Sequence, residues 1–505
     1  MRKRHASSVG PFLLLALAAS APAPAPAASP PAQLTIVYTA DLGGHLEPCG
    51  CTVDQRGGLA RMAAVLARIR AEGQPVVFVG GGDLLFDTRP EGEERRQAIS
   101  AARTAAQALR RMRLDATLSG ERDAYLGPAF LAELGLPVTD GRLLSAGATK
   151  VGFGPLGRVP AAPVRLAVLQ EGGTRAGAAR AEEARRGGVS VLFTSHRANL
   201  LDDDVNRVLL DGPVPVVQVQ GRGQSLARVD LFLRGDRSRG FEVLPAAAER
   251  DEELELLEAR RVEYARRRAA ALAEQQAELA QALATKLEEL AARALALRSK
   301  PLPGPPLDRP SLRVSFIPLT QELPEDPAVH ALLARHHEAV GRENLARARA
   351  EARPCPPPAP GAATFIGTEE APHGGVSSCK GCHPEAVAQW ETTKHARAWA
   401  TLVKGGRTHD LDCVSCHVTG WKEPGGACSV AATEGRRDVQ CESCHGPASL
   451  HAFDPPGHIV RAPGEERCRT CHTPEHSTRF EPTSFFKGVL GPGHGDGLRG
   501  RPRLP

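Results

Sequence analysis

Four short stretches in the last quarter of the chain share one pattern: CKGCH at 379–383, CVSCH at 413–417, CESCH at 441–445 and CRTCH at 468–472. In each, two cysteines separated by two residues are followed at once by a histidine. This C-x-x-C-H pattern is the attachment signature of a c-type haem, because two thiols bond to one porphyrin edge and the adjacent imidazole reaches the iron. Zinc sites built from Cys-x-x-Cys pairs would leave the histidine after every second cysteine unexplained. We therefore predict four covalently bound haems.

The predicted haem residues fall into two sets. The attachment residues are Cys379, Cys382, Cys413, Cys416, Cys441, Cys444, Cys468 and Cys471, and the proximal iron ligands are His383, His417, His445 and His472. A second histidine on the opposite face of an iron closes it to substrate and leaves electron transfer as its task, whereas an open position permits small-molecule chemistry. Seven further histidines are available in this region: His373, His395, His409, His451, His458, His476 and His494. This surplus favours closed irons.

Three stretches, CKGCHPEAVAQWETTKHARAW, CVSCHVTGW and VQCESCHGPASLH, resemble the tetrahaem cytochrome c-554 family over roughly 370–475. The resemblance implies periplasmic electron transfer through closely stacked haems, with the four motif histidines as proximal ligands. It also implies that His395 and His451 are distal ligands. For the other two distal positions we select His373 and His494. Some members of the family keep one haem five-coordinate, so an oxidoreductase that acts on a small nitrogen or other inorganic substrate is an alternative.

The first half of the chain alternates short apolar runs with helical patterns. Strand-like runs occur at 34–39, 76–83, 115–120, 164–169, 189–195, 214–220 and 226–233, and amphipathic helices are expected at 58–73 and 91–113. This alternation is typical of layered α/β domains, in which helices cover a sheet. We expect an α/β domain over 33–245.

Four stretches of this domain resemble the calcineurin-like metallophosphatases of the 5′-nucleotidase branch: YTADLGGHLEPCGC at 38–51, GGLARMAAVL at 57–66, FVGGGDLL at 78–85 and LSGERD at 118–123. That family binds two metals through Asp-x-His, Gly-Asp, Gly-Asn-His and later histidines. Asp41 and Asp83 match the two aspartates, but Gly43 stands where the first motif has histidine. Glu121 and Arg122 replace the asparagine and the histidine of the third motif, and no terminal Gly-His-x-His is found.

These replacements predict that phosphatase chemistry is lost. Two hard cations need a bridging carboxylate together with histidine and amide ligands, and three or more of those ligands differ here. Asp41, Asp83, Glu121 and His196 can still hold a single divalent cation. A bifunctional protein with metal-dependent phosphoesterase activity is therefore a further alternative, as is a domain that only docks partners.

The middle of the chain predicts long helices. Residues 249–298 contain no Gly or Pro, and apolar residues recur there at steps of three and four from Leu279 to Leu297. This pattern predicts one long helix or a helical hairpin with a single apolar stripe. Packing along the neighbouring domain is favoured over an oligomerising coil because the heptad is not sustained. A Pro-rich run at 301–310, a second helix at about 326–352 and a stiff linker at 354–361 complete a segment over 246–361.

The last domain, 362–505, is expected to consist of short helices and loops packed on the haems. Its short apolar stretches leave little material for a core of its own, so the porphyrins would supply one. Aromatic residues are only 4% of the whole chain, which agrees with this expectation.

The start of the chain predicts export. Arg2, Lys3 and Arg4 precede the apolar run FLLLALAA at 12–19 and small residues suited to cleavage, so 1–28 is expected to hold a secretory signal peptide and the start of a Pro/Ala tether. No other apolar stretch approaches the ~20 residues that a membrane span needs. We expect a periplasmic or otherwise exported protein with redox proteins as partners. Its oligomeric state is left open.

Two further features limit the interpretation. Lys and Arg number 63 against 58 Asp and Glu, and no basic cluster is present, which excludes a nucleic-acid-binding protein. A hydrophobic content of 42% excludes wholesale disorder.

Four cysteines lie outside the motifs, Cys49, Cys51, Cys355 and Cys428, and two disulfides among them are possible in an exported chain.

Overall fold

The computed structural model describes residues 31–48, 55–170, 172–195, 206–236, 240–273, 275–352, 354–366, 374–460, 463–473, 477, 480–491 and 494. The expected signal peptide, Cys49, Cys51, His196, His373 and His476 lie outside these ranges. Within them, no helix combines the length and the apolar character that a membrane crossing requires.

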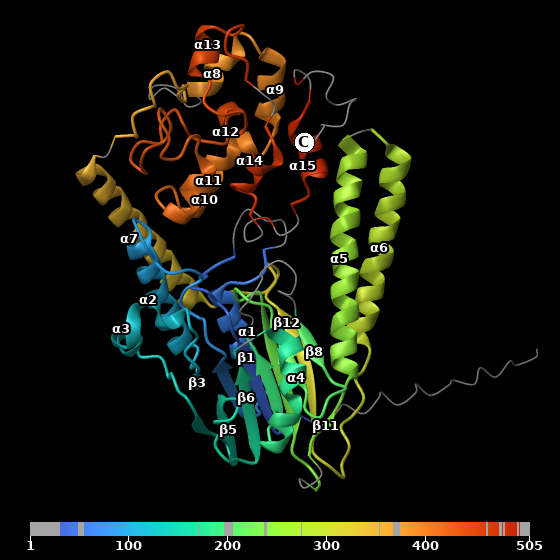
Figure 1. Ribbon diagram of the computed structural model, residues 1–505. Helices are drawn as coiled ribbons and strands as arrows, with labels where there is room; N and C mark the ends of the chain where they lie inside the picture. Colours follow the sequence, from blue (N-terminus) through green and yellow to red (C-terminus); the bar gives the residue numbers. More distant parts are fainter. Residues whose placement is uncertain are drawn as a thin grey trace, which may run out of the picture.

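Two six-stranded mixed sheets form the base of the molecule (Figure 1). The first runs in the order β11 (Glu242–Val243), β12 (Ser311–Pro318), β10 (Ser225–Phe232), β1 (Leu34–Thr39), β2 (Val76–Gly80) and β3 (Ala116–Thr117). The second runs β4 (Arg142–Ala146), β5 (Thr149–Pro155), β6 (Val164–Leu169), β7 (Val191–Thr194), β9 (Val216–Gln218) and β8 (Arg207–Leu209). Strands β1, β2 and β3 are parallel neighbours, as are β5, β6, β7 and β9.

The two sheets pack face to face, and alternation along the strands explains why. In β1, Ile36 and Tyr38 point to the other sheet while Val37 points to the helices outside. Phe193 of β7 stacks on Tyr38 with ring centres 4.1 Å apart, and these side chains are fully buried. The space between the sheets is therefore the main apolar core.

Helices cover the outer face of each sheet. On the first sheet lie α1 (Leu59–Ala71), α2 (Arg95–Arg111), α3 (Gly127–Leu134) and α7 (Pro327–Glu351), and on the second lies α4 (Gly173–Arg186). The result is four layers: helix, sheet, sheet, helix. The expected layered α/β domain is confirmed.

The first sheet extends beyond the expected boundary at residue 245. Strand β12 pairs with β10 over eight residues, from Ser311 to Pro318. Between β11 and β12 the chain forms an antiparallel hairpin of α5 (Ala246–Ala273) and α6 (Ala277–Ser299), which stands beside the sheets (Figure 1). The Pro-rich run at 301–310 therefore leads back into the sheet instead of ending a domain, because its partner strand lies far back in the sequence.

The region of the four motifs consists of short helices, as expected. They are α8 (Gly374–Lys380), α9 (Pro384–Thr392), the 3-10 helix η3 (His395–Arg397), α10 (Ala398–Gly405), α11 (Leu411–His417), α12 (Cys441–His445), α13 (Ser449–Phe453), α14 (Glu465–Arg469) and α15 (Pro482–Val489). A disulfide between Cys355 and Cys428 ties the Pro-rich linker to this region. Only two small apolar clusters form among the described residues here, one around Trp399 and Val414 and one around Trp390.

A buried polar network joins the motif region to the α/β unit. Gln97 of α2 donates from Nε2 to Asp410 Oδ1 over 2.6 Å, and its Oε1 accepts from Asn344 Nδ2 and from the Leu411 amide. Asn344 of α7 also donates to the His409 carbonyl at 3.0 Å. Gln97, Asn344 and Asp410 are each at most 7% exposed. Asp410 is the N-cap of α11, so the α/β unit holds the start of the second motif helix.

This network predicts the effect of a single replacement. Gln97→Leu leaves the buried Asp410 carboxylate without this donor and two N–H groups without this acceptor, so we expect the unfolding free energy to fall by about 1–3 kcal/mol. Differential scanning calorimetry of the haem-loaded protein measures this as a lower transition temperature. Gln107→Leu, on the exposed side of the same helix, is the control. Equal transition temperatures for the two variants would contradict the role of Gln97.

Candidate haem sites and candidate metal site

Each of the four motifs is wound into about one helical turn. In the first, the His383 amide donates to the Cys379 carbonyl at 2.8 Å, and in the fourth the His472 amide donates to the Cys468 carbonyl at 2.9 Å. The second and third motifs lie within α11 and α12. Because residues four apart share one face of a helix, the first thiol and the imidazole of each motif lie on the same side. This is the arrangement that one porphyrin needs.

Two motif histidines face a second histidine. The ring centres of His383 and His451 are 6.3 Å apart with an interplanar angle of 26°. Those of His472 and His395 are 6.2 Å apart. Two imidazoles that bind one metal from opposite sides have ring centres roughly 6 Å apart, because each metal–nitrogen bond is about 2 Å. The spacing of both pairs therefore fits an iron between the two rings.

Hydrogen bonds orient several of these imidazoles. His417 Nδ1 donates to the Ala398 carbonyl at 2.6 Å, and His451 Nδ1 donates to the His458 carbonyl at 2.8 Å. His472 Nδ1 lies 3.0 Å from the Ser477 hydroxyl. A neutral imidazole whose Nδ1 carries the proton has its lone pair on Nε2, so Nε2 is the available ligand atom. Burial also lowers the pKa of His395 and of His472, which favours the neutral, metal-binding form.

The other distal candidates are placed differently. His494 is half-buried after α15, and within the described ranges its ring makes no contact with a motif histidine. The same holds for His409 and His458, while His373 and His476 lie outside those ranges. The structure thus brings His395 and His451 to motif histidines, and it leaves His373 and His494 as sequence-based choices.

The attachment cysteines of different motifs lie close together. The Cys379 side chain lies beside that of Cys441, and the Cys471 side chain lies beside that of Cys416. Thiols in contact bring the bonded edges of their porphyrins together. The first motif is thereby next to the third, and the second next to the fourth.

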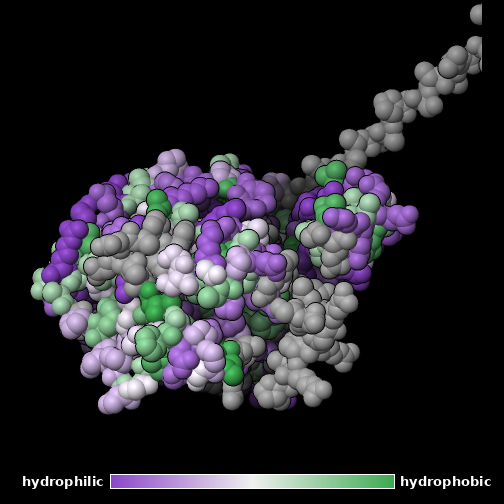
Figure 2. All heavy atoms as spheres, turned by 90° about the horizontal axis from the view of Figure 1, so that it is seen from above, coloured by the Kyte–Doolittle hydropathy of each residue, from purple (hydrophilic) through white to green (hydrophobic). Residues whose placement is uncertain are grey.

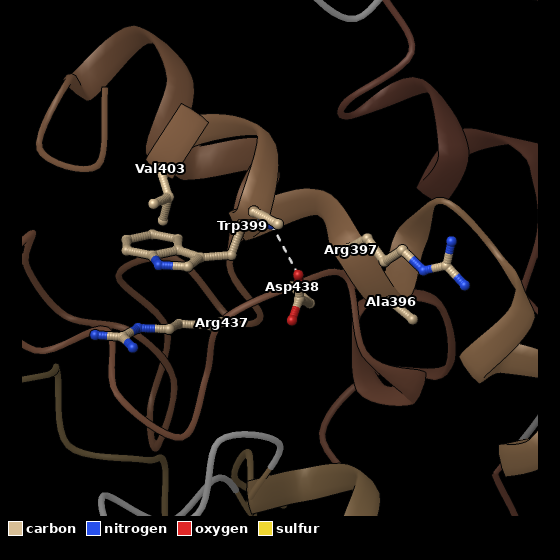
Figure 3. A pocket seen from close by; sticks show the side chains of 7 residues that line it. Ala396, Arg397, Trp399, Val403, Arg437 and Asp438 are labelled. Atoms are coloured by element: carbon tan, nitrogen blue, oxygen red, sulfur yellow. Dashed lines mark hydrogen bonds between the residues drawn. The ribbon is translucent and has the colours of Figure 1, made fainter. Parts of the chain in front are cut away.

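An apolar cavity of about 400 Å³ lies beside the second motif (Figure 3). It is lined by Ala396, Arg397, Trp399, Ala400, Val403, Arg437 and Asp438. Asp438 accepts a hydrogen bond from the Trp399 amide at 2.8 Å, and the Arg437 guanidinium lies over the Trp399 ring. The His417 carbonyl accepts a hydrogen bond from the Asp438 amide and its Nδ1 donates to the Ala398 carbonyl, so hydrogen bonds join this histidine to the wall of the cavity. Apolar walls with arginines at the rim suit a porphyrin and its carboxylates.

The surface nearby carries apolar side chains. Phe453, at the end of α13, is 91% exposed, and Ile459 in the following loop is 80% exposed. Both lie close in sequence to His451. Figure 2, a view from above Figure 1, shows such apolar residues interspersed with hydrophilic ones. Side chains of this size at the surface are suited to packing on a bound porphyrin edge.

The candidate metal site has a different chemistry from that of a dinuclear phosphatase. Asp41 and Asp83 follow β1 and β2, and both have φ of 52°, in the left-handed region. Asp83 Oδ1 accepts the Arg122 amide at 2.8 Å. The Arg122 guanidinium forms an ion pair with Asp87 at 2.8 Å, and Arg222 lies 3.6 Å from the same carboxylate.

Asp87 and Arg222 are residues that the sequence patterns did not single out. Burial alone would raise the pKa of Asp87, but the His45 imidazole, 3.6 Å away, and the two arginines outweigh it and lower that pKa. A fixed guanidinium thus supplies positive charge where the family resemblance implies metals. The only sequence signal for this exchange was Arg122 in the place of a histidine.

Within the described residues, the structure does not group the other candidate metal ligands with Asp41 and Asp83. Glu121 is exposed, and His196 lies outside the described ranges. Within those ranges, no group of three or more His, Cys, Asp or Glu side chains is arranged to hold a metal ion. The donor set that the structure describes therefore does not fit a dinuclear centre.

Asp123 supports the turn that carries Glu121 and Arg122. Its carboxylate accepts the Leu85 amide at 2.9 Å and the Gly120 amide at 3.0 Å, and its side chain is 3% exposed. Burial raises the pKa of Asp123 to about 6, since it outweighs these hydrogen bonds.

The raised pKa of Asp123 predicts a pH dependence. The folded protein binds this proton near pH 6 and the unfolded chain near 3.8, so ionised Asp123 costs stability above pH 6 and the cost disappears toward pH 4. We expect wild type to lose up to about 3 kcal/mol relative to Asp123→Asn between pH 4 and pH 7, from a shift of roughly two pKa units. Thermal unfolding of both proteins across this range measures it. Glu121→Gln is the exposed control, and a pH-independent difference for Asp123→Asn would refute the assignment.

Comparison with known proteins supports the family resemblance of the motif region. Residues 378–446 match the family model described as cytochrome c554 and c-prime. Over 93 residues the chain is 33% identical to cytochrome c-554 of Nitrosomonas europaea, which covers 15% of this chain and 40% of that protein. The chain thus spans less than half the length of this curated relative.

Several solved structures share part of the fold of this chain. They include the sulfate thiohydrolase SoxB of Thermus thermophilus in complex with glycerol, at 13% identity and a TM-score of 0.38, covering 63% of this chain and 62% of that one. A 5′-nucleotidase precursor, also from Thermus thermophilus, is similar at 15% identity and a TM-score of 0.33, with 61% and 59% covered. The family match confirms the cytochrome c-554 signature that the sequence predicts in the motif region.

Proposed function

We propose that this protein is an exported cytochrome with four c-type haems that carries electrons between periplasmic or outer-membrane redox partners. The observation that carries the proposal is the spacing of His383 from His451 and of His472 from His395, each near 6 Å between ring centres. Both pairs lie in the region with the family resemblance. An iron closed by two imidazoles has no position for substrate, which leaves electron transfer.

The residues of this chain have distinct roles in the proposal. Bound haem supplies one-electron chemistry. The eight motif cysteines hold it, and the four motif histidines ligate the irons from one side. His451 and His395 complete the first and fourth sites, and the bond from His417 Nδ1 to Ala398 orients the second proximal ring. His373 and His494 remain our candidates for the other two distal positions.

Contacts between motifs support transfer from one haem to the next. Because Cys379 touches Cys441 and Cys416 touches Cys471, the groups attached there have neighbouring edges. Electrons can then pass within each pair without a conformational change. Partners need to approach only one exposed edge.

A second candidate function is an oxidoreductase with one open iron. The cavity of about 400 Å³ beside His417 favours it, since that space can admit a small molecule. The surplus of histidines in the sequence favours the closed form. Spectroscopy of the oxidised protein separates the two.

We infer that the α/β unit does not hydrolyse phosphoesters. Arg122 and Arg222 supply the positive charge near Asp87 that metals would otherwise provide. The exposed position of Glu121 removes a further ligand from the site. The unit is then a scaffold for the motif region.

Electron paramagnetic resonance of the full-length protein, expressed with haem-maturation machinery, tests the main proposal. We expect four low-spin haems in the oxidised protein and one new high-spin signal in His451→Ala and in His395→Ala, because each loses an axial ligand. His330→Ala, at an exposed position of α7, is the control. Chain without bound haem would refute the proposal. A stoichiometric high-spin signal in the wild type that shifts with nitrite or hydroxylamine would favour the oxidoreductase.

A phosphoesterase assay tests the scaffold role. Purified protein with Mn²⁺ or Mg²⁺ and a nucleoside monophosphate should release phosphate no faster than buffer, because no bridging pair of cations can form. Turnover of about 1 s⁻¹ or more, a typical enzymatic rate, would show that the unit is active. Asp83→Asn distinguishes such turnover from a contaminating enzyme, since only intrinsic activity would be lost.

A further inference from the structure

A half-buried ion pair links the α/β unit to the second motif. Glu47, in the loop after β1, binds the Arg407 guanidinium, which precedes α11. His337 of α7 lies 3.1 Å from the same carboxylate oxygen and 2.8 Å from Arg407. The side chains of Glu47, Arg407 and His337 are 30%, 26% and 12% exposed. Three elements that are distant in sequence thus meet at one charged contact.

Both members of the pair are ionised. Burial would raise the pKa of Glu47, but the hydrogen bond to His337 and the charge of Arg407 outweigh it and lower that pKa to about 2. Burial would lower the pKa of Arg407, but Glu47 and other nearby acidic groups raise it overall. The pair therefore keeps its charges at neutral pH.

Arg407 also reaches the attachment site of the second motif. Its side chain hydrogen-bonds the Cys413 thiol, and its guanidinium lies 3.7 Å from Asp410. Asp410 caps α11 and is held by Gln97 of the α/β unit. Asp410 and Asp412 are acidic neighbours of the Cys413 thiol, and Arg407 is a cation beside it.

We propose that the α/β unit sets the reduction potential of the group attached at Cys413 and Cys416, through Glu47 and its control of Arg407. This inference rests on the proposed function. A positive charge near a redox centre stabilises the added electron, and a negative charge opposes it. Because the contact is partly buried, solvent screens these charges less than at the surface. Glu47 offsets the charge of Arg407 and so holds the potential lower than Arg407 alone would.

The inference gives the α/β unit a task that needs no metal. The loop from Asp41 to Glu47 begins at the candidate metal site. It ends at Glu47, which binds Arg407 beside the second motif. The unit acts here as a positioning and charge-setting scaffold.

Spectroelectrochemical titration of the haem-loaded, full-length protein tests the proposal. Glu47→Gln keeps the shape and removes the negative charge, so one potential should rise. Arg407→Gln removes the positive charge, so the same potential should fall, and Arg407→Lys should restore it. The matched control is Glu93→Gln, which breaks another ion pair between the two regions, with Lys422 at 2.9 Å, without touching Arg407. It should leave all potentials unchanged.

The outcomes separate this inference from the proposed function. Four bound haems with potentials that stay unchanged in Glu47→Gln and Arg407→Gln would overturn the inference and leave electron transfer intact. Shifts in the same direction in both variants would indicate general disruption and would also overturn it. Wild-type chain without haem would overturn the proposed function itself. If Arg407→Gln fails to retain haem, Glu47→Gln against Glu93→Gln decides the question.

Discussion

Each C-x-x-C-H motif must present two thiols and an imidazole to one side of a single helical turn, and the rest of the motif region follows from this constraint. Such turns are short, and the α-helices described here are short as well, from five to nine residues. Short helices bury little apolar surface, and the clusters around Trp399 and Trp390 are correspondingly small. In the proposed holoprotein the porphyrins complete the core, and the short helices serve as their attachment points.

Sequence patterns predicted the helices and strands that depend mainly on residues close together in the chain. The apolar run at 34–39 and the helical period in 58–73 predicted β1 and α1, because β1 is buried along its whole length and α1 buries one face. Strand β12 and its pairing with β10 were missed because a strand partner across a long insertion leaves no local signal. β5 was missed for another reason: Gly152 and Gly154 break its apolar pattern, and Gly152 is required there, since a Cβ would lie 2.2 Å from the Pro160 carbonyl oxygen.

The candidate functional sites likewise combine features that the sequence predicts with features that only the folded chain shows. The attachment residues could be named from spacing alone, because the covalent chemistry fixes that spacing. The assignment of His451 to His383 and of His395 to His472 could not, since each pair joins distant segments that meet only in the folded chain. The sequence showed which positions of the phosphatase-like motifs carry other residues. It did not show the ion pairs that Asp87 forms with Arg122 and Arg222. Asp87 and Arg222 belong to no motif, and their role depends on a contact with Arg122 that only the tertiary structure shows.

In the proposed function, arginines take the place of metals, and the α/β unit then serves the motif region as a scaffold. Carboxylates grouped near a former metal position repel one another unless a cation is present, and a guanidinium provides one that cannot dissociate. The loop from Asp41 to Glu47 then keeps its conformation without a ligand, and its far end is available to bind Arg407. The contact between the two regions is largely polar, through Gln97, Asn344, Asp410 and Glu47. Buried polar networks define one geometry more strictly than apolar contacts do, because a shifted network leaves donors and acceptors unpaired. A scaffold that fixes the second motif in one position, with one arrangement of charges around it, is what such an interface provides.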